Sequence, residues 1–166
     1  MTAALSDIRR VAGQVPDPEI PVLTVADLGI LRDVQVDAAG RIQVTITPTY
    51  SGCPAMDTIA EEIAETCARH GWPDVTVRRE LSPAWTTDWM TDEGKRKLRE
   101  FGIAPPARAG LCGKPSGGPV PVPLSVRCPR CGSPDTREIN RFGSTACKAL
   151  YACNSCLEPF DYFKAF

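Results

Sequence analysis

Four cysteines in two pairs carry the clearest chemical signal in the chain. Cys128 and Cys131 stand in "CPRCG", Cys153 and Cys156 stand in "CNSC", and 21 residues separate the pairs. Each Cys-x2-Cys turn presents two thiolates on one tight knuckle, and four sulfurs satisfy the tetrahedral preference of zinc. Such pairs are usually ~15–20 residues apart. The sequence therefore predicts a structural zinc site, while redox dithiols and an iron or iron–sulfur site stay open as alternatives.

The region around these pairs, residues 125–166, offers two further features whose roles the sequence leaves open. Cys147 lies between the pairs and is either a packed residue or a spare ligand. The tail "EPFDYFKAF" is either an apolar surface for a protein partner or the last strand of the ribbon. The region has six Lys and Arg residues against four Asp and Glu residues, and a four-thiolate site adds negative charge. This balance argues against nucleic-acid binding.

A separate cysteine, Cys53, stands in "YSGCPAM" directly before an apolar-periodic stretch. Proline is favoured at the first helical position, so Pro54 predicts Cys53 as the N-cap. A sulfur there faces free backbone N–H groups and the positive end of the helix dipole, which lowers the pKa of a thiol. The acids Asp17, Glu19 and Asp27 either converge on it or belong to a helix-breaking loop. The residues alone leave a functional and a structural thiol equally open.

The remaining residues assemble no enzyme active site. His70 is the only histidine, so no Ser-His-Asp or Cys-His catalytic set can form. Cys67 belongs to an apolar helix face, and Trp85 and Trp89 are either core residues or a partner-binding patch. The net charge is −1, no apolar stretch is as long as a membrane span, and the N-terminus lacks a signal-peptide pattern. We therefore expect a cytoplasmic protein that binds neither nucleic acid nor membrane.

The periodicity of the chain predicts an α+β or α/β fold, a small mixed sheet with packed helices, followed by a C-terminal zinc ribbon. A stretch rich in Pro and Gly separates the two parts and is typical of a linker. The expected domains are residues 1–103, a linker 104–124 and the ribbon 125–166. In the first, we expect helices over 3–13, 54–70 and 91–99, a β-hairpin over 30–47, one helical turn in "TVADLG" and a strand over 74–81.

Longer motifs resemble a known family. "DPEIPVLTVADLGILRDV" (17–34) and "YSGCPAM" (50–56) resemble the SufT/PaaD-like family of iron–sulfur assembly proteins. "WTTDWMTDEGKRKLREFGIAPP" (85–106) and "FGSTACKALYACNSCLEPFDYFK" (142–164) resemble its PaaD branch, which adds a zinc ribbon. That branch usually has a cysteine near the C-terminus where this chain has Ala165, so any role of that cysteine is missing here.

This resemblance implies a non-catalytic accessory subunit of phenylacetyl-CoA epoxidase, a ring-epoxidising di-iron monooxygenase system of aerobic phenylacetate degradation. The implied role is maturation of an iron or iron–sulfur centre, with the oxygenase or reductase subunits as partners and Cys53 as a transient ligand or client contact. The alternative is a structural adaptor that docks on the oxygenase without handling metal. Whether the chain has enzymatic activity of its own, and whether it forms a homo-oligomer, stays open.

Overall fold

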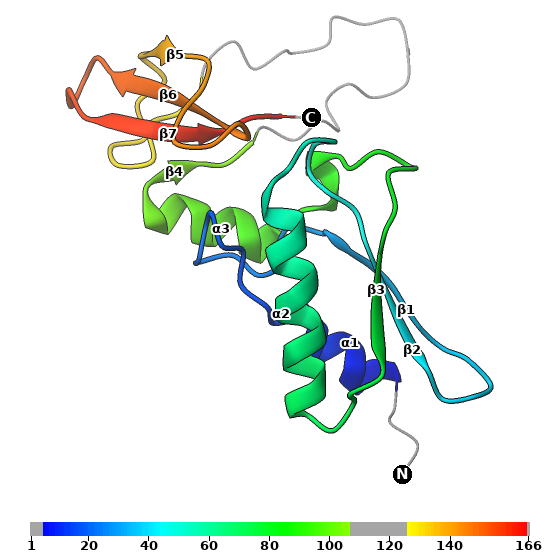
Figure 1. Ribbon diagram of the computed structural model, residues 1–166. Helices are drawn as coiled ribbons and strands as arrows, with labels where there is room; N and C mark the ends of the chain where they lie inside the picture. The colour runs from blue at the N-terminus through cyan, green and yellow to red at the C-terminus, as the bar shows by residue number, and fades with distance from the viewer. Residues whose placement is uncertain (1–4, 107–125, 166) are drawn as a thin grey trace, which may run out of the picture. The chain divides into compact units, whose positions relative to one another are not determined.

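The computed structural model describes residues 5–106 and 126–165, which fall into two compact units. The first unit contains Met1–Trp85 and Trp89–Gly94, and the second contains Thr86–Asp88 and Lys95–Phe166. Helices and small sheets confirm the predicted α+β class (Figure 1). Most of the predicted linker, residues 107–124, lies outside the described residues. No helix in the described ranges is long and apolar enough to cross a membrane.

A three-stranded mixed sheet forms the frame of the first unit (Figure 1). The predicted hairpin is confirmed, because the first two strands pair antiparallel with Val34 opposite Val44. The third strand pairs parallel to the second, and a helix makes the crossover between them, as a parallel connection requires. The order is β1-β2-β3, with β1 at Leu31–Val36, β2 at Ile42–Ile46 and β3 at Val75–Arg79.

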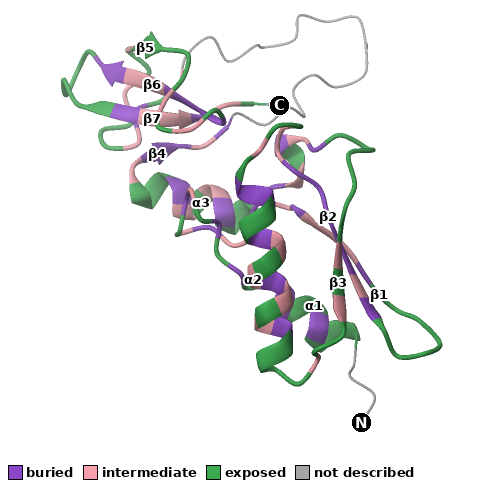
Figure 2. Cartoon of the chain, viewed as in Figure 1, coloured by how far each residue is buried: buried purple, intermediate pink, exposed green. Residues whose placement is uncertain are grey.

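Two helices, α1 (Leu5–Gly13) and α2 (Ala55–Arg69), contact each other and the sheet. Their inward faces are buried and their outward faces exposed, as Figure 2 shows for α2. Burying one large aliphatic side chain contributes about 1.5–3 kcal/mol, so this face accounts for much of the unit's stability. Cys67 is fully buried, which confirms it as a core residue. The core residues of α2 are Ala55, Met56, Ile59, Ile63 and Cys67.

The long connection between α1 and β1 is held in shape by its own side chains. Thr24 and Asp27 form a reciprocal pair, in which the Asp27 N–H donates to Thr24 Oγ1 (3.1 Å) and the Thr24 N–H donates to Asp27 Oδ2 (3.0 Å). This is the arrangement of a helix capping box. The N–H of Leu28 then bonds the Thr24 carbonyl at 3.0 Å and closes the predicted single turn.

The segment after β3 packs against this connection. The Trp85 indole N–H donates to the Leu28 carbonyl at 2.8 Å, and Trp85 is buried. The Arg32 guanidinium lies 3.4 Å from the centroid of the Trp89 ring. Gly29 has φ +70°, and a Cβ there would approach the Trp89 carbonyl oxygen to 2.3 Å. Both tryptophans therefore serve internal packing rather than an exposed patch.

The segment continues through the short 3-10 helix η1 (Thr87–Trp89) into α3 (Asp92–Phe101). Thr91 caps α3 as predicted, because its Oγ1 accepts the Gly94 N–H at 2.9 Å.

A four-stranded sheet organises the second unit, in the order β4-β7-β6-β5. The tail pairs with β6 as strand β7, with Phe160 and Phe163 buried, so it is the last strand of the ribbon. β4 pairs parallel to β7, and the predicted boundary after residue 103 falls within β4. The strands are β4 at Ile103–Ala104, β5 at Thr136–Asn140, β6 at Lys148–Cys153 and β7 at Pro159–Phe163.

Candidate functional site

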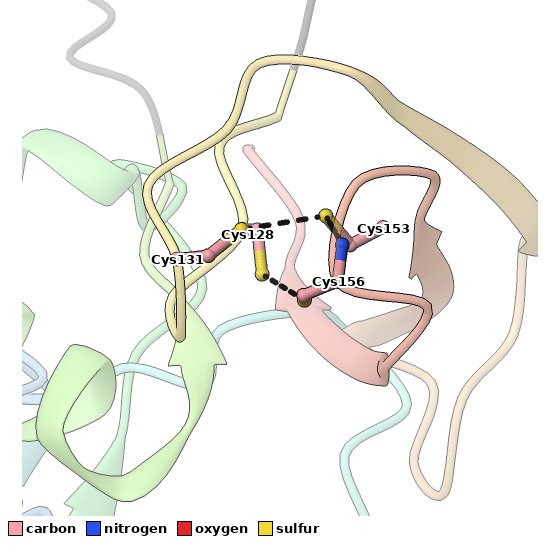
Figure 3. A group of neighbouring side chains, drawn as sticks. All are labelled: Cys128, Cys131, Cys153 and Cys156. Atoms are coloured by element: carbon pink, nitrogen blue, oxygen red, sulfur yellow. Dashed lines mark hydrogen bonds between the residues drawn. The ribbon is translucent and has the colours of Figure 1, made fainter.

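The two cysteine pairs meet in the second unit, each at the end of a tight turn (Figure 3). All four Sγ atoms lie within 4.8 Å of one another. Cys128 and Cys156 are 3.7 Å apart between sulfurs, and Cys131 and Cys153 are 3.5 Å apart. A tetrahedral ion with metal–sulfur bonds of ~2.3 Å holds its sulfurs ~3.8 Å apart. The arrangement therefore fits one tetrahedral metal ion, and these four residues are the group that could hold it.

Backbone geometry explains why the first knuckle has this shape. Gly132 follows the second cysteine of its pair with φ +75°, a region that glycine adopts without strain. Its N–H donates to the Cys128 carbonyl at 2.9 Å, and the Cys128 N–H donates to the Ser133 carbonyl at 3.0 Å. These bonds turn the chain so that both sulfurs face the same point.

The second knuckle repeats the turn with a different residue. Leu157 occupies the place of Gly132 with φ +64°, and it is 80% exposed. The Cys156 N–H lies 3.5 Å from the Cys153 sulfur, and this bond, together with the Ser155 N–H and the neighbouring thiols, lowers the pKa of Cys153 to about 6. Such N–H bonds to sulfur favour the thiolate, which is the form that binds metal. The sequence identified the cysteines but not Leu157, because a left-handed backbone is usually indicated by glycine and not by a bulky residue.

Two of the four cysteines belong to the core of the second unit. Cys128 and Cys153 are buried in a cluster with Ala104 and Phe160. Cys147 is buried elsewhere and lies outside the four-sulfur group; its Sγ is 3.0 Å from Thr145 Oγ1. The structure therefore favours the packed role for Cys147 over that of a spare ligand.

Cys53 forms a second, separate candidate site in the first unit. α2 begins at Ala55 with Pro54 at the N-cap position, so the prediction of Cys53 as N-cap is wrong by one residue. The predicted lowering of its pKa is also wrong. Burial raises the pKa of the half-buried Cys53 thiol, and the charges of Glu19 and Asp17 raise it further. The N–H of Ala55 acts in the opposite direction but does not outweigh them.

Two of the three predicted acids therefore act on Cys53. Asp17 is buried, and its Oδ1 accepts the N–H groups of Glu19 (2.8 Å) and Ile20 (2.7 Å), which fixes the turn that carries both acids. Asp27 is bound instead in the capping box and receives the Thr91 N–H at its carbonyl (2.9 Å). Its observed contacts give it a structural role.

The structure adds one residue that the sequence argument did not select. Tyr50 stands three residues before Cys53, and its side chain forms a hydrogen bond that lowers the pKa of the thiol. The backbone also links the two, because the Cys53 N–H donates to the Tyr50 carbonyl at 3.2 Å. The position of Tyr50 within "YSGCPAM" was the sequence signal that could have identified it. Glu19, Asp17 and Tyr50 thus all act on the thiol, whereas among the described residues the four ribbon cysteines alone form a group of the kind that could hold a metal ion.

Comparisons with known proteins agree with both parts of the chain. Residues 5–78 match the family described as "Iron-sulfur cluster assembly protein", and residues 114–164 match "PaaD zinc beta ribbon domain". The fold of the first unit also resembles a crystal structure from Bacillus anthracis titled as a domain of unknown function, DUF59. That match has a TM-score of 0.53 and 23% identity, and covers 57% of this chain and 90% of the other. The chain thus joins an iron–sulfur assembly domain to a zinc ribbon.

Two curated relatives place it more closely. A protein of Escherichia coli (strain K12), provisionally named as one of the subunits of 1,2-phenylacetyl-CoA epoxidase, is 50% identical over 158 residues, covering 95% of this chain and 91% of that one. The Fe-S protein maturation auxiliary factor of Porphyromonas gingivalis (strain ATCC BAA-308 / W83) is 39% identical over 93 residues, covering 55% of this chain and 88% of that one. The chain belongs to the PaaD family.

Proposed function

We propose that this chain is a non-catalytic accessory protein of a phenylacetyl-CoA epoxidase, and that it assists the maturation of an iron or iron–sulfur centre in the oxygenase or reductase subunits. The E. coli relative carries the name of an epoxidase subunit, and the P. gingivalis relative carries the name of an Fe-S maturation factor. Iron or a cluster is cargo in this proposal. The proposed place of action is the cytoplasm.

The effect of the Glu19 and Asp17 charges on the half-buried Cys53 thiol is the observation that carries the proposal. A half-buried thiol beside two carboxylates has a raised pKa and is mostly protonated near neutral pH. A bound cation reverses this preference, because it stabilises the thiolate and is attracted by the same carboxylates. In such a site the thiol carries no charge when cargo is absent and becomes a thiolate ligand when iron arrives, which suits transient binding.

The ribbon has a different part in the proposal, with Cys128, Cys131, Cys153 and Cys156 as permanent zinc ligands. Four-thiolate zinc sites are closed and structural, and zinc has no redox chemistry of its own. Binding supplies much of the folding free energy of so small a module. The ribbon is therefore the stable part that presents a surface to partners, and the Cys53 turn is the part that handles cargo.

A structural adaptor without metal cargo is the alternative function. The raised pKa of Cys53 favours it, because a protonated thiol in a packed turn also has a purely structural explanation. The two functions predict different effects when the sulfur atom of Cys53 is replaced. Replacing Sγ by a hydroxyl keeps the size of the side chain but removes a soft metal ligand.

The deciding experiment measures epoxidase activity in cells that depend on this chain. The variant Cys53→Ser is compared with Ser51→Ala, which alters an exposed residue of the same turn. Metal maturation predicts loss of activity only for Cys53→Ser, with both variants folded by circular dichroism. Equal activity of both variants would establish the adaptor instead.

A further inference from the structure

The net charge of −1 is the sum of opposite net charges on the two units. The first unit contains seven Lys and Arg residues against 14 Asp and Glu residues, and the second contains 12 against six. The first is thus acidic by seven charges and the second basic by six. A charge separation of this size within a short chain indicates association with a charged partner.

The basic unit has an open groove of about 480 Å³ between the end of α3 and the first zinc knuckle. Phe101 is 58% exposed there, which is unusual for a large aromatic side chain. Apolar and basic groups therefore stand together around one hollow. The lining residues are Arg99, Glu100, Phe101, Gly102, Pro129 and Arg130.

Two arginines contribute positive charge to this groove. Arg99 and Arg130 are both exposed and form no ion pair with any part of the chain that the structure describes. Glu100, the one acid in the lining, pairs instead with Arg96 one turn earlier. Aromatic residues and arginine are the residues most enriched at the centres of protein interfaces. The groove therefore fits an acidic surface with small apolar residues.

A surface of that kind is present on the acidic unit. Glu61 and Glu65 lie one turn apart on the outward face of α2 and are exposed. Neither makes an ion pair within residues 5–106 and 126–165. Ala64 and Ala68 stand beside them, so the face is flat enough for an aromatic ring.

We propose that a second copy of this chain occupies the groove, with the α2 face of each copy docked on Arg99, Phe101 and Arg130 of the other. Each copy carries both surfaces, and the proposal is that the contact forms twice in a symmetric dimer. This inference is independent of the proposed function. Nucleic acid is less suited to the groove, because Glu100 stands in the lining and Phe101 is the only exposed aromatic residue of that lining.

Charge reversal on each side tests the contact. In the variant Arg99→Glu/Arg130→Glu, an acidic groove faces an acidic helix, and in the variant Glu61→Lys/Glu65→Lys, a basic groove faces a basic helix. Each variant alone repels its own copies. Mixed in equal amounts, the two variants complement each other at both contacts. At one contact a basic groove meets an acidic helix, as in the native chain, and at the other an acidic groove meets a basic helix. The control Arg137→Glu/Arg141→Glu changes the net charge as the arginine variant does, but at exposed residues outside the groove.

Analytical ultracentrifugation of the full, metal-loaded chain gives the mass. We expect twice the 18.0 kDa chain mass at low salt for the native chain and the control, 18.0 kDa for each variant alone, and a restored dimer in the mixture. Salt at 1 M shortens the screening length to about 3 Å and should dissociate the dimer. A native chain that stays at 18.0 kDa, variants that remain dimeric, or a mixture that stays monomeric would each overturn the proposal. So would a monomeric native chain that retards a DNA oligonucleotide through Arg99 and Arg130.

Discussion

Gly29→Ala tests how the segment that carries the acids is held against the tryptophan segment. A Cβ at position 29 would lie 2.3 Å from the Trp89 carbonyl oxygen, 2.7 Å from Trp89 Cβ and 2.8 Å from the Trp89 carbonyl carbon. Two of these atoms belong to the backbone, so rotation of a side chain cannot relieve the overlap. Overpacking of this kind costs ~1–3 kcal/mol. The left-handed backbone, φ +70°, costs alanine a further ~1–2 kcal/mol.

Gly40→Ala is the matched control. Gly40 has a similar φ of +80°, but its added Cβ has no atom within 4 Å. It therefore carries the backbone cost without the overlap. We expect Gly29→Ala to reduce the free energy of unfolding by ~2–5 kcal/mol and Gly40→Ala by ~1–2 kcal/mol.

Urea denaturation followed by tryptophan fluorescence measures the difference. All three tryptophans, Trp72, Trp85 and Trp89, belong to the first unit, so the signal reports on that unit. With a slope of ~2 kcal/mol per M, a difference of ~2 kcal/mol separates the two midpoints by about 1 M. Equal midpoints would refute the close approach of Gly29 to Trp89 and, with it, the account of how the segment is fixed.

Three further predictions concern the two sites and their support. Removing a carboxylate from beside Cys53 lowers the pKa of its thiol, so Glu19→Gln should speed the alkylation of Cys53 by iodoacetamide at pH 8, measured by peptide mass spectrometry. The control is Glu80→Gln, which alters an exposed residue. An alkylation rate that Glu19→Gln leaves unchanged would speak against an electrostatic effect of Glu19 on the thiol. The four ribbon thiols should resist alkylation until a chelator is added, because a bound metal holds them as ligands, and ready reaction before chelation would indicate redox dithiols instead. Thr91→Ala removes the cap of α3 and should cost ~1 kcal/mol in urea denaturation, whereas Thr91→Ser should restore most of it; equal losses would mean that the hydroxyl does not cap the helix.

The sequence predicted the parts of the fold that depend on local pattern. The apolar spacing from Met56 to Cys67 predicted α2 and its buried face, and the alternation around Val34 and Val44 predicted the hairpin. The two Cys-x2-Cys turns predicted the four-sulfur cluster, because each pair is fixed within a few residues.

What the sequence missed depends on distant contacts and burial. The Trp85 bond to the Leu28 carbonyl spans 57 positions, and the two residues of β4 form a strand only because β7 lies beside them. The pKa of Cys53 was predicted in the wrong direction for the same reason. A helix start is visible in the sequence, whereas the burial of the sulfur and the approach of Glu19 are not.

The metal content of the purified chain tests the central claim, that Cys53 handles iron, most directly. Native protein and Cys53→Ser are purified without oxygen, exposed to ferrous iron and sulfide, desalted, and examined by elemental analysis and optical absorption. We expect about one zinc per chain in both proteins, from the closed four-thiolate site. Iron and sulfide-linked absorption should appear in the native chain alone. Equal iron in both proteins, or none in either, would contradict the assignment of Cys53 as a ligand for iron.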